Sequence, residues 1–519
     1  MAATPTTKSQ VQAYRFVLKR MESALVRRDA VMLHDPMRTH IRAGVVGLCL
    51  ALVAVAGVFV FGFFKPREEL GATDEILIGS ESGAVYVHLN NPTSRLIPVT
   101  NLASARLILI KMAGPAGAGN TAGAAPRRIS DDILKDVPRE PLAGIPGAPV
   151  DIPGPDELVG PTWSLCDTTE VDGSLPPQVQ LDRAKITSTA VVGLDRIGRP
   201  LGGDEALLTR SAQNGKHYLV YRGRRAEVDL ANENVRLALN LAEDQAERRP
   251  MSNGLLNAIP EIPPLRAPKI PGVNQPPEGY RVAGHPVGAV VRTDRAEGSK
   301  FYVLLRSGRQ EISRSVANLI RASNKRDIEI PAVPLGVIAE APEAAEADRI
   351  NVTDYPADVP TVLPVRQSVL ACLHWQYRNG EQETTITVAD RLTLPEGQRP
   401  VRLAQADGGA GENLDHFFLP PGKGASVRGV TPRQPANTGT IYLVTDLGTK
   451  YGVPSTTGAT SLQLATALGL GSFQPAPEAI LRLLPSGAAL DPNAVRTYDS
   501  VPLPPGAGVE LPAPQPAGQ

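Results

Sequence analysis

The chain of 519 residues has few aromatic residues, few cysteines and no net charge. Aromatic side chains make up only 4% of the chain, so its cores must be built mainly from Val, Leu, Ile and Ala. A formal net charge of zero gives no global bias towards nucleic acid. Glycine and proline contribute 48 and 49 residues, and several small cores joined by Pro-rich linkers fit this composition better than one large core.

The sequence also lacks the familiar motifs of nucleotide, acyl-transfer and zinc chemistry. It contains no G-x-x-x-x-G-K-[ST] phosphate loop, no G-x-S-x-G nucleophile elbow and no H-E-x-x-H motif. The seven histidines are scattered, and the cysteines are too few for a typical Cys-rich zinc site. We therefore expect no catalytic site, no cofactor and no metal. An enzyme such as a nucleotidase or wall hydrolase is the weakest hypothesis.

One long apolar run lies near the N-terminus. Residues 43–64 read AGVVGLCLALVAVAGVFVFGFF and carry no charge, which is long enough to cross the roughly 30 Å core of a bilayer as a helix. A buried helix of a soluble domain rarely stays uncharged this long. A cleaved signal peptide fits less well, because 42 residues precede the run and Lys65-Pro66 follow it. The sequence predicts a single-pass membrane protein.

The flanks of this run predict its orientation. Residues 1–42 hold eight Lys or Arg residues, whereas Lys65 and Arg67 are followed at once by acidic residues. Lys and Arg are enriched on the cytoplasmic side of membrane spans, so we expect the arm 1–42 inside the cell. About 455 residues then lie outside.

The cytoplasmic arm contains a predicted amphipathic helix. In TKSQVQAYRFVLKRMESALVRR (7–28), apolar residues recur at spacings of three and four and form one stripe flanked by basic residues. Two interpretations are equally supported by these residues: a helix lying on anionic lipid headgroups, and a helix that docks on a partner's cytoplasmic domain. The candidate docking residues are Val11, Tyr14, Arg15, Leu18, Arg20, Met21 and Leu25.

Four stretches outside share a pattern, in which a tyrosine in a β-rich run is followed by a turn, a short strand and a helix-like segment. We predict small repeats at 72–130, 204–258, 285–340 and 411–484, marked by Tyr86, Tyr218, Tyr302 and Tyr442. Any β-rich protein shows some such echoes, but here Tyr, Gly and the trailing helix recur together. Units this small should pack on one another or on a shared core. The Pro-rich tail 485–519 is expected to be extended or disordered.

Two of the three cysteines lie in the predicted outer region. Cys166 and Cys372 are each close to a tryptophan, and disulfides persist outside the cell, so one bridge is suggested. Two free thiols or intermolecular pairing are the alternatives. A bridge would pin a central β-rich domain assembled from residues 156–200 and 362–410. Cys49 lies inside the apolar run and is most simply a small hydrophobic residue.

In combination, the arm, the apolar helix and the repeats resemble the EccB family, a membrane component of the ESX (type VII) secretion system of actinobacteria, including mycobacteria. The resemblance runs in order along nearly the whole chain. The segments that carry it are TKSQVQAYRFVLKRMESALVRRD (7–29), DPMR (35–38), FFKP (63–66), SGAVYV (82–87), NLASARLIL (101–109), GIPGAP (144–149), WSLCDT (163–168), YGVP (451–454) and LRLLPSG (481–487).

This resemblance implies a fold and a set of partners. The expected architecture is an elongated α+β periplasmic domain of four repeats around a central domain, with Cys166 and Cys372 at the positions of the family disulfide. The implied location is the inner membrane, in a complex with the ATPase EccC, the membrane proteins EccD and EccE, and the mycosin protease (MycP). Neighbouring copies are expected to associate through their periplasmic domains, while the arm packs on cytoplasmic components.

The leading hypothesis is therefore a structural core component that scaffolds the channel for export of WXG100 (Esx) and PE/PPE proteins. The alternative is a membrane-tethered module that binds the cell wall (peptidoglycan). ATP hydrolysis has been attributed to the family, but the missing phosphate loop gives that no support in these residues, and we expect hydrolysis to belong to EccC.

Overall fold

The computed structural model describes residues 7–28, 36–64, 69–117, 125–195, 197–242, 246–324, 329–432, 438–457 and 459–500. The chain divides into two compact units, residues 1–70 and 71–519. The last 19 residues of the predicted Pro-rich tail lie outside the described residues.

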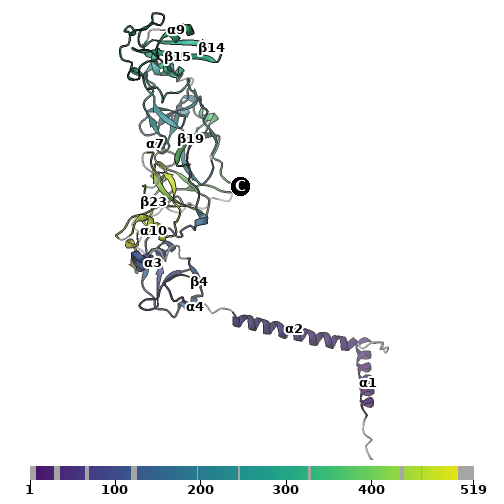
Figure 1. Cartoon of the computed structure of the whole chain (residues 1–519). Coiled ribbons are helices and arrows are strands. Elements are labelled where there is room, and N and C mark those ends of the chain that lie inside the picture. Colours follow the sequence, from purple (N-terminus) through teal and green to yellow (C-terminus); the bar gives the residue numbers. More distant parts are fainter. Residues whose placement is uncertain are drawn as a thin grey trace, which may run out of the picture. The chain divides into compact units, whose positions relative to one another are not determined.

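The N-terminal unit consists of two helices, α1 (Lys8–Arg27) and α2 (Pro36–Phe64), both labelled in Figure 1. The extended residue Thr7 starts α1, and its backbone N–H donates to Gln10 Oε1 at 3.0 Å, as in a capping box. Arg28 adopts a left-handed conformation with φ 58° and ends the helix. Within α2, the 21 residues Ile41–Phe61 form the one described helix that is long and apolar enough to cross a membrane. The predicted apolar helix is confirmed.

The second unit, residues 71–519, is called the outer unit after its predicted location; it is α+β and consists mainly of sheet. Its largest sheet has seven strands and contains both Cys166 and Cys372. Cys166 and Cys372 lie directly opposite each other on neighbouring antiparallel strands, and the disulfide between them is confirmed. We call this seven-stranded sheet the central sheet. In order across it, the strands are β20 (Val401–Arg402), β21 (His416–Phe418), β7 (Lys185–Val192), β6 (Thr162–Glu170), β18 (Leu370–Arg378), β19 (Glu381–Ala389) and β8 (Arg199–Pro200).

Four further sheets share one order of elements: three antiparallel strands, a helix, a return alongside the first strand, and a short helix. The first contains β1 (Glu75–Gly79), β2 (Val85–Leu89), β3 (Arg95–Val99), α3 (Leu102–Gly117), β4 (Arg127–Ile129) and α4 (Asp131–Leu134). The second contains β9 (Glu205–Ser211), β10 (His217–Tyr221), β11 (Arg224–Glu227), α6 (Glu233–Ala238), β12 (Arg249–Met251), α7 (Asn253–Ala258) and β13 (Glu261–Ile262).

The third sheet contains β14 (Val290–Arg295), β15 (Gly298–Leu304), β16 (Arg309–Ile312), α8 (Arg314–Asn324) and α9 (Leu335–Glu340), and its return is a single bridge between Arg292 and Ala332. The fourth contains β22 (Gly424–Val430), β23 (Ile441–Thr445), β24 (Lys450–Val453), α10 (Ser461–Ala467), β25 (Gln474–Pro477) and α11 (Glu478–Leu481). Among the described residues, the remaining strands and α-helix are β5 (Leu142–Gly144), α5 (Pro177–Gln180), β17 (Thr361–Val362) and β26 (Arg496–Tyr498).

Shared apolar cores join several of these sheets, although the first and third sheets also have cores of their own. One core combines the inner face of the central sheet with the second and fourth sheets, through residues such as Trp163, Trp375, Tyr218, Leu256 and Ile480. A second core joins the first and fourth sheets. It packs α3 against α10 and the strands beside it.

The element boundaries differ from the expected ones in three places. Residues 416–418 belong to the central sheet through β21, not to the fourth repeat predicted at 411–484. The first predicted repeat does not end at residue 130, because β5 joins its sheet. The tail does not begin at Pro485: Leu490 is fully buried and β26 pairs with β5. The few core residues of the tail lie in a Pro- and Gly-rich stretch, whose composition is typical of an extended or disordered segment.

Candidate functional site

The four predicted tyrosines lie at corresponding places in four different sheets. Each sits on the second strand of its meander, on β2, β10, β15 and β23. A cation lies over each ring, with distances to the ring centroid of 5.5 Å for Arg139 over Tyr86, 5.1 Å for Arg225 over Tyr218, 5.3 Å for Arg309 over Tyr302 and 5.9 Å for Lys450 over Tyr442. This range permits a cation–π interaction.

In three sheets the cation occupies the same position on the third strand, two residues before the residue paired with the tyrosine. Tyr218 is paired with Glu227 and Tyr302 with Glu311, and the stacked arginine comes two residues before the glutamate on the same strand. Lys450 likewise precedes Gly452, the partner of Tyr442, by two residues. Residues i and j−2 are diagonal neighbours on one face of an antiparallel pair, which brings the long cationic side chain over the ring.

The second and third sheets also share a cross-strand ion pair. Lys216 Nζ lies 2.9 Å from Glu227, and Lys300 Nζ lies 3.0 Å from Glu311. In both, a lysine two residues before the tyrosine pairs with the glutamate opposite that tyrosine. The recurring pattern Lys-x-Tyr … Arg-x-Glu is present in the sequence, but the prediction from sequence used only the tyrosine.

Each of the four sheets has a further feature that the sequence analysis did not predict. A proline after the last short helix lies beside the third strand. Carbonyls of four prolines accept hydrogen bonds from the third strand of the four sheets, each at 2.8–3.0 Å. The pairs are Pro138 with Leu96, Pro260 with Arg225, Pro342 with Arg309 and Pro485 with Lys450. An aliphatic-rich short helix followed by proline is the signal that could have revealed them. In the first sheet, this proline segment brings Arg139 beside Leu96 and over Tyr86.

The tyrosines are not a ligand-binding surface. Tyr86, Tyr218 and Tyr302 are 7%, 6% and 2% exposed, and Tyr442 is half-buried. Rings that are buried and covered by a cation cannot also stack on a sugar or a peptide. The cation contacts instead link the second strand to the third strand or, in the first sheet, to the segment that contains Arg139.

The predicted docking residues lie on α1 with their side chains exposed. Tyr14 is 67%, Leu18 47%, Met21 59% and Leu25 81% exposed, and Val11 is 40% exposed. Arg15 and Arg20 are also exposed on this helix. An apolar stripe of this size on a surface helix marks an interaction site, either with protein or with lipid.

Buried polar groups form a second cluster, at the contact between the central sheet and the second sheet. Asp167, which follows Cys166, accepts hydrogen bonds from Ser252 and Ser188. Burial raises the pKa of Asp167 to about 6, although these hydrogen bonds and Arg249 favour the ionised form. The sequence singled out neither Asp167 nor Arg249, because their partners are distant in the chain.

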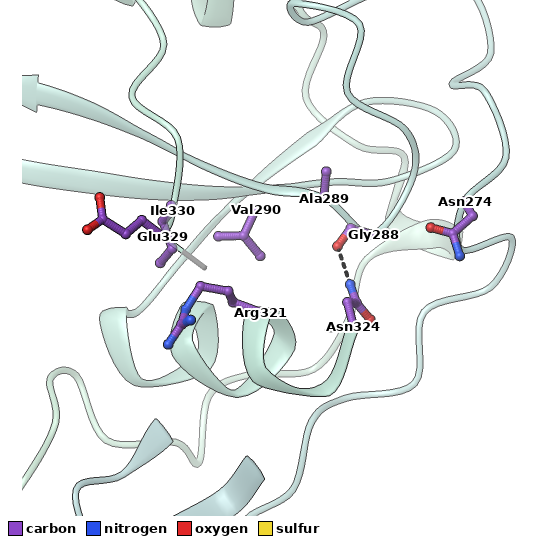
Figure 2. Close-up of a pocket in the computed structure, with 8 residues that line it drawn as sticks. All are labelled: Asn274, Gly288, Ala289, Val290, Arg321, Asn324, Glu329 and Ile330. Atoms are coloured by element: carbon purple, nitrogen blue, oxygen red, sulfur yellow. Dashed lines mark hydrogen bonds between the residues drawn. The ribbon is translucent and has the colours of Figure 1, made fainter. Parts of the chain in front are cut away.

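The described residues of the outer unit enclose one small hollow and line three open clefts. Figure 2 shows the hollow, which lies beside α8 and β14. It encloses about 10 Å³, which is room for roughly one water. On its wall, the side-chain amide of Asn324 donates a hydrogen bond to the Gly288 carbonyl at 2.8 Å. A cleft of about 310 Å³ is lined by Trp375, Arg225 and Glu478, among others. Among the described residues, no group of three or more His, Cys, Asp or Glu side chains could hold a metal ion.

A buried Ser–His pair also occurs beside the disulfide. Ser164 Oγ and His374 Nδ1 lie 3.0 Å apart, but both residues are buried within the central sheet, at 2% and 5% exposure. A nucleophile must reach its substrate, so this pair is a structural contact between β6 and β18.

Comparisons with known proteins agree with this architecture. A family model described as "Type VII secretion system ESX-1, transport TM domain B" matches residues 3–503. The ESX-1 secretion system ATPase EccB1 of Mycobacterium tuberculosis (strain ATCC 25618 / H37Rv) is 30% identical over 511 residues, which cover 96% of each chain. The ESX-3 secretion system ATPase EccB3 of Mycolicibacterium smegmatis (strain ATCC 700084 / mc(2)155) is 30% identical over 505 residues, covering 95% of this chain and 91% of the relative.

Solved structures show the same fold. One chain of an intact ESX-5 inner membrane complex matches with a TM-score of 0.67 and 26% identity, covering 99% of both chains. A chain of the EccB3 dimer from the ESX-3 core complex matches with a TM-score of 0.65 and 28% identity, covering 81% of this chain and 99% of that one. The fold is that of a membrane component of a type VII secretion system. The chain belongs to the EccB family and is a component of the ESX inner membrane complex.

Proposed function

We propose that this chain is a scaffolding subunit, which couples cytoplasmic and outer parts of the secretion complex without performing chemistry itself. The observation that carries the proposal is the exposed apolar stripe of α1, on a helix separate from the outer unit. A stripe in which Leu25 is 81% exposed gains stability only by burial against something else.

The occupant of the stripe is proposed to be a cytoplasmic domain of a partner. By resemblance to the family, the candidate partners are EccC, EccD and EccE, with the mycosin protease on the outer side. The excess of Lys and Arg in residues 1–42 supports an N-terminus inside the cell, with α2 crossing the membrane once and the outer unit in the periplasm.

The outer unit is proposed to oligomerise and to shape the exit path of exported WXG100 (Esx) and PE/PPE proteins. The four sheets with one order of elements are, in this proposal, four copies of a single repeat around the disulfide-linked central domain. An EccB3 relative has been solved as a dimer, which supports self-association of this chain.

The docking role is tested by exchanging the stripe for polar residues. Leu18→Ser, Met21→Ser and Leu25→Ser, made together in the full chain, should reduce co-purification of the cytoplasmic partners in mild detergent at least tenfold. Phe16→Ser is a matched control, because Phe16 is 57% exposed but lies on the other side of the helix at 100° per residue.

Two outcomes would reject docking. If the triple variant retains its partners as well as Phe16→Ser does, the stripe does not bind them. If partners are retained, and if α1 of the wild-type chain alone exchanges its amide hydrogens more slowly in anionic than in neutral bilayers while α1 of the triple variant does not, the stripe lies on lipid instead.

The wall-binding alternative is not favoured by the tyrosines, because three of the four are buried under cations. The word ATPase in the relatives' names is a statement about those proteins. For this chain we assign hydrolysis to EccC, since the sequence contains no phosphate loop.

A further inference from the structure

One buried carboxylate links the first turn of α7 to the central sheet, in addition to a hydrogen bond from the Asn253 N–H to the Gly411 carbonyl at 3.2 Å. Asp167 on β6 is 1% exposed. Its Oδ2 accepts from the Ser252 backbone N–H at 2.7 Å, and its Oδ1 accepts from Ser252 Oγ at 2.8 Å. Ser188 Oγ on β7 donates to the same Oδ1 at 2.9 Å. Because Ser252 is the residue that caps α7, this carboxylate ties the second sheet's short helix to the central sheet.

The charged groups near Asp167 come from two segments of the chain, one with Glu247 and Arg249 and the other with Asp415. Arg249 on β12 is 2% exposed, attracts Asp167, and donates to the carbonyl and, at 2.7 Å, to the hydroxyl of Ser368. Asp415, just before β21, accepts from the Ser188 N–H at 2.9 Å. Glu247, which precedes β12, interacts with Arg249 and accepts from the Val365 N–H. In the described structure, Nε and Nη1 of Arg249 have no hydrogen-bond partner, so the cation is only partly compensated.

Burial of the carboxylate outweighs the hydrogen bonds and Arg249, so the carboxyl group holds a proton more tightly when α7 is attached than when it is detached. Burial raises its pKa to about 6 in the attached state. Detachment exposes Asp167 to water, where an Asp carboxyl has a pKa of about 3.9. Protonation of Asp167 therefore adds to the free energy that holds α7 on the central sheet. This added stability is fully present below about pH 4 and is lost as the pH rises through about 6.

We propose that Asp167 makes the attachment of α7 to the central sheet a proton-sensitive joint, which holds more tightly in a mildly acidic medium than at neutral pH. The apolar core beneath α7, with Leu255 and Leu256, does not titrate, so the joint loosens locally and the sheets stay folded. This proposal is independent of the scaffolding role, since it concerns a contact inside the outer unit.

The test is hydrogen exchange of the full chain in mild detergent, followed by mass spectrometry of peptides covering residues 249–259. After correction for intrinsic rates, protection of these amides should be about tenfold greater at about pH 5 than at about pH 7.5. Asp167→Asn should abolish this difference, because its side chain does not titrate.

Asp182→Asn is the matched control. Asp182 is an exposed carboxylate 3.2 Å from Arg210 on β9, so it too links a loop of the central sheet to the second sheet. It should keep the wild-type pH dependence. Equal protection of the wild type at both pH values would overturn the proposal, and this result does not depend on how well Asp167→Asn folds. An unchanged pH dependence in Asp167→Asn would overturn it as well.

Discussion

At the scale of single residues, the outer unit relies on long cationic side chains to cover buried aromatic rings. Arg309 shows how much one side chain contributes. Its guanidinium lies 5.3 Å from the centroid of Tyr302, its Nε donates to the Ala341 carbonyl at 3.0 Å, and its Nη1 lies 3.3 Å from Glu343. It thereby connects β15, β16 and the segment that follows α9. With few aromatics in the chain, such contacts compensate for small cores.

Arg309→Met keeps most of the apolar stem but removes the charge over Tyr302. We expect the local unfolding free energy of β15 and β16 to fall by about 1–2 kcal/mol, from the lost cation–π contact and hydrogen bond. Native-state hydrogen exchange of peptides from these strands measures this. Arg306→Met is the control, because Arg306 is 55% exposed and its ion pairs should contribute little. Equal effects of the two substitutions would refute a special role for the stacked cation.

Asp407 is a residue whose pH dependence has the opposite sign to that of Asp167. Its carboxylate accepts hydrogen bonds from the backbone N–H groups of Gly409, Ala410, Glu412 and Asn413, at 2.7–3.1 Å. Burial raises the pKa of Asp407, but these four donors outweigh burial and lower it below its ordinary value. Its stabilisation of the loop is thus present above the unfolded pKa of about 3.9 and is lost as the pH falls through the lower folded value.

Asp407→Ala should therefore loosen residues 407–413 by about 1–2 kcal/mol at neutral pH. The difference from wild type should shrink below about pH 4, where the wild-type carboxylate is itself protonated. Exchange of the loop amides at both pH values measures this. Glu412→Ala, in the same loop but with an exposed side chain, should have little effect. A cost of Asp407→Ala that is the same at both pH values would contradict the argument.

At the residue level, sequence alone points to side chains that stand in a recognisable local pattern. Each of the four tyrosines stands in a short β-rich run, and each of the two disulfide cysteines lies near a tryptophan. Asp167, Ser252 and Arg249 were missed, because strands far apart in the chain bring them together. No local pattern encodes a hydrogen bond between residues 85 positions apart.

At the scale of elements, the pair β6–β18 organises the outer unit. The disulfide joins residues 206 positions apart, and Trp163 lies opposite Trp375 three residues further along the same pair of strands. Closing a loop of this length removes conformational freedom from the unfolded chain, worth about 5 kcal/mol in the chain-entropy model. The bridge thus stabilises the one sheet on which the second and fourth sheets share a core.

Replacing Cys166 and Cys372 together by serine should lower the unfolding free energy of the central sheet by about 2–5 kcal/mol. The chain's two tryptophans both lie on this sheet, so denaturant unfolding followed by tryptophan fluorescence reports on it directly. Cys49→Ser, in α2, should leave the transition unchanged. An unchanged midpoint in the double variant would mean that the disulfide does not stabilise the fold.

The helices of the N-terminal unit were the elements best predicted from sequence. Both α1 and α2 are long and strongly patterned, one by an apolar stripe and the other by an uncharged run, and such patterns do not depend on tertiary contacts. Short strands such as β21 and β26, of three residues each, were assigned to the wrong part or missed. Pairing with distant strands forms these elements, so their own sequence carries little signal.

At the scale of the whole molecule, the chain combines a helix with an uncovered apolar stripe, an apolar helix and an outer unit of interlocked sheets. The cavities among the described residues are small or open, and the buried polar groups hold modules together. These features suit a subunit whose role is to position other proteins. Membership of the EccB family places the chain in the ESX inner membrane complex.

The most direct test of the scaffolding role is to purify the tagged full chain from its host in mild detergent, weigh the particle by mass photometry and identify its components by mass spectrometry. The account predicts a megadalton-scale particle that contains EccC, EccD and EccE, and predicts that deleting residues 7–28 disperses it. A lone chain that carries no partners and is retained on cell-wall material would contradict the account and favour a wall-binding module.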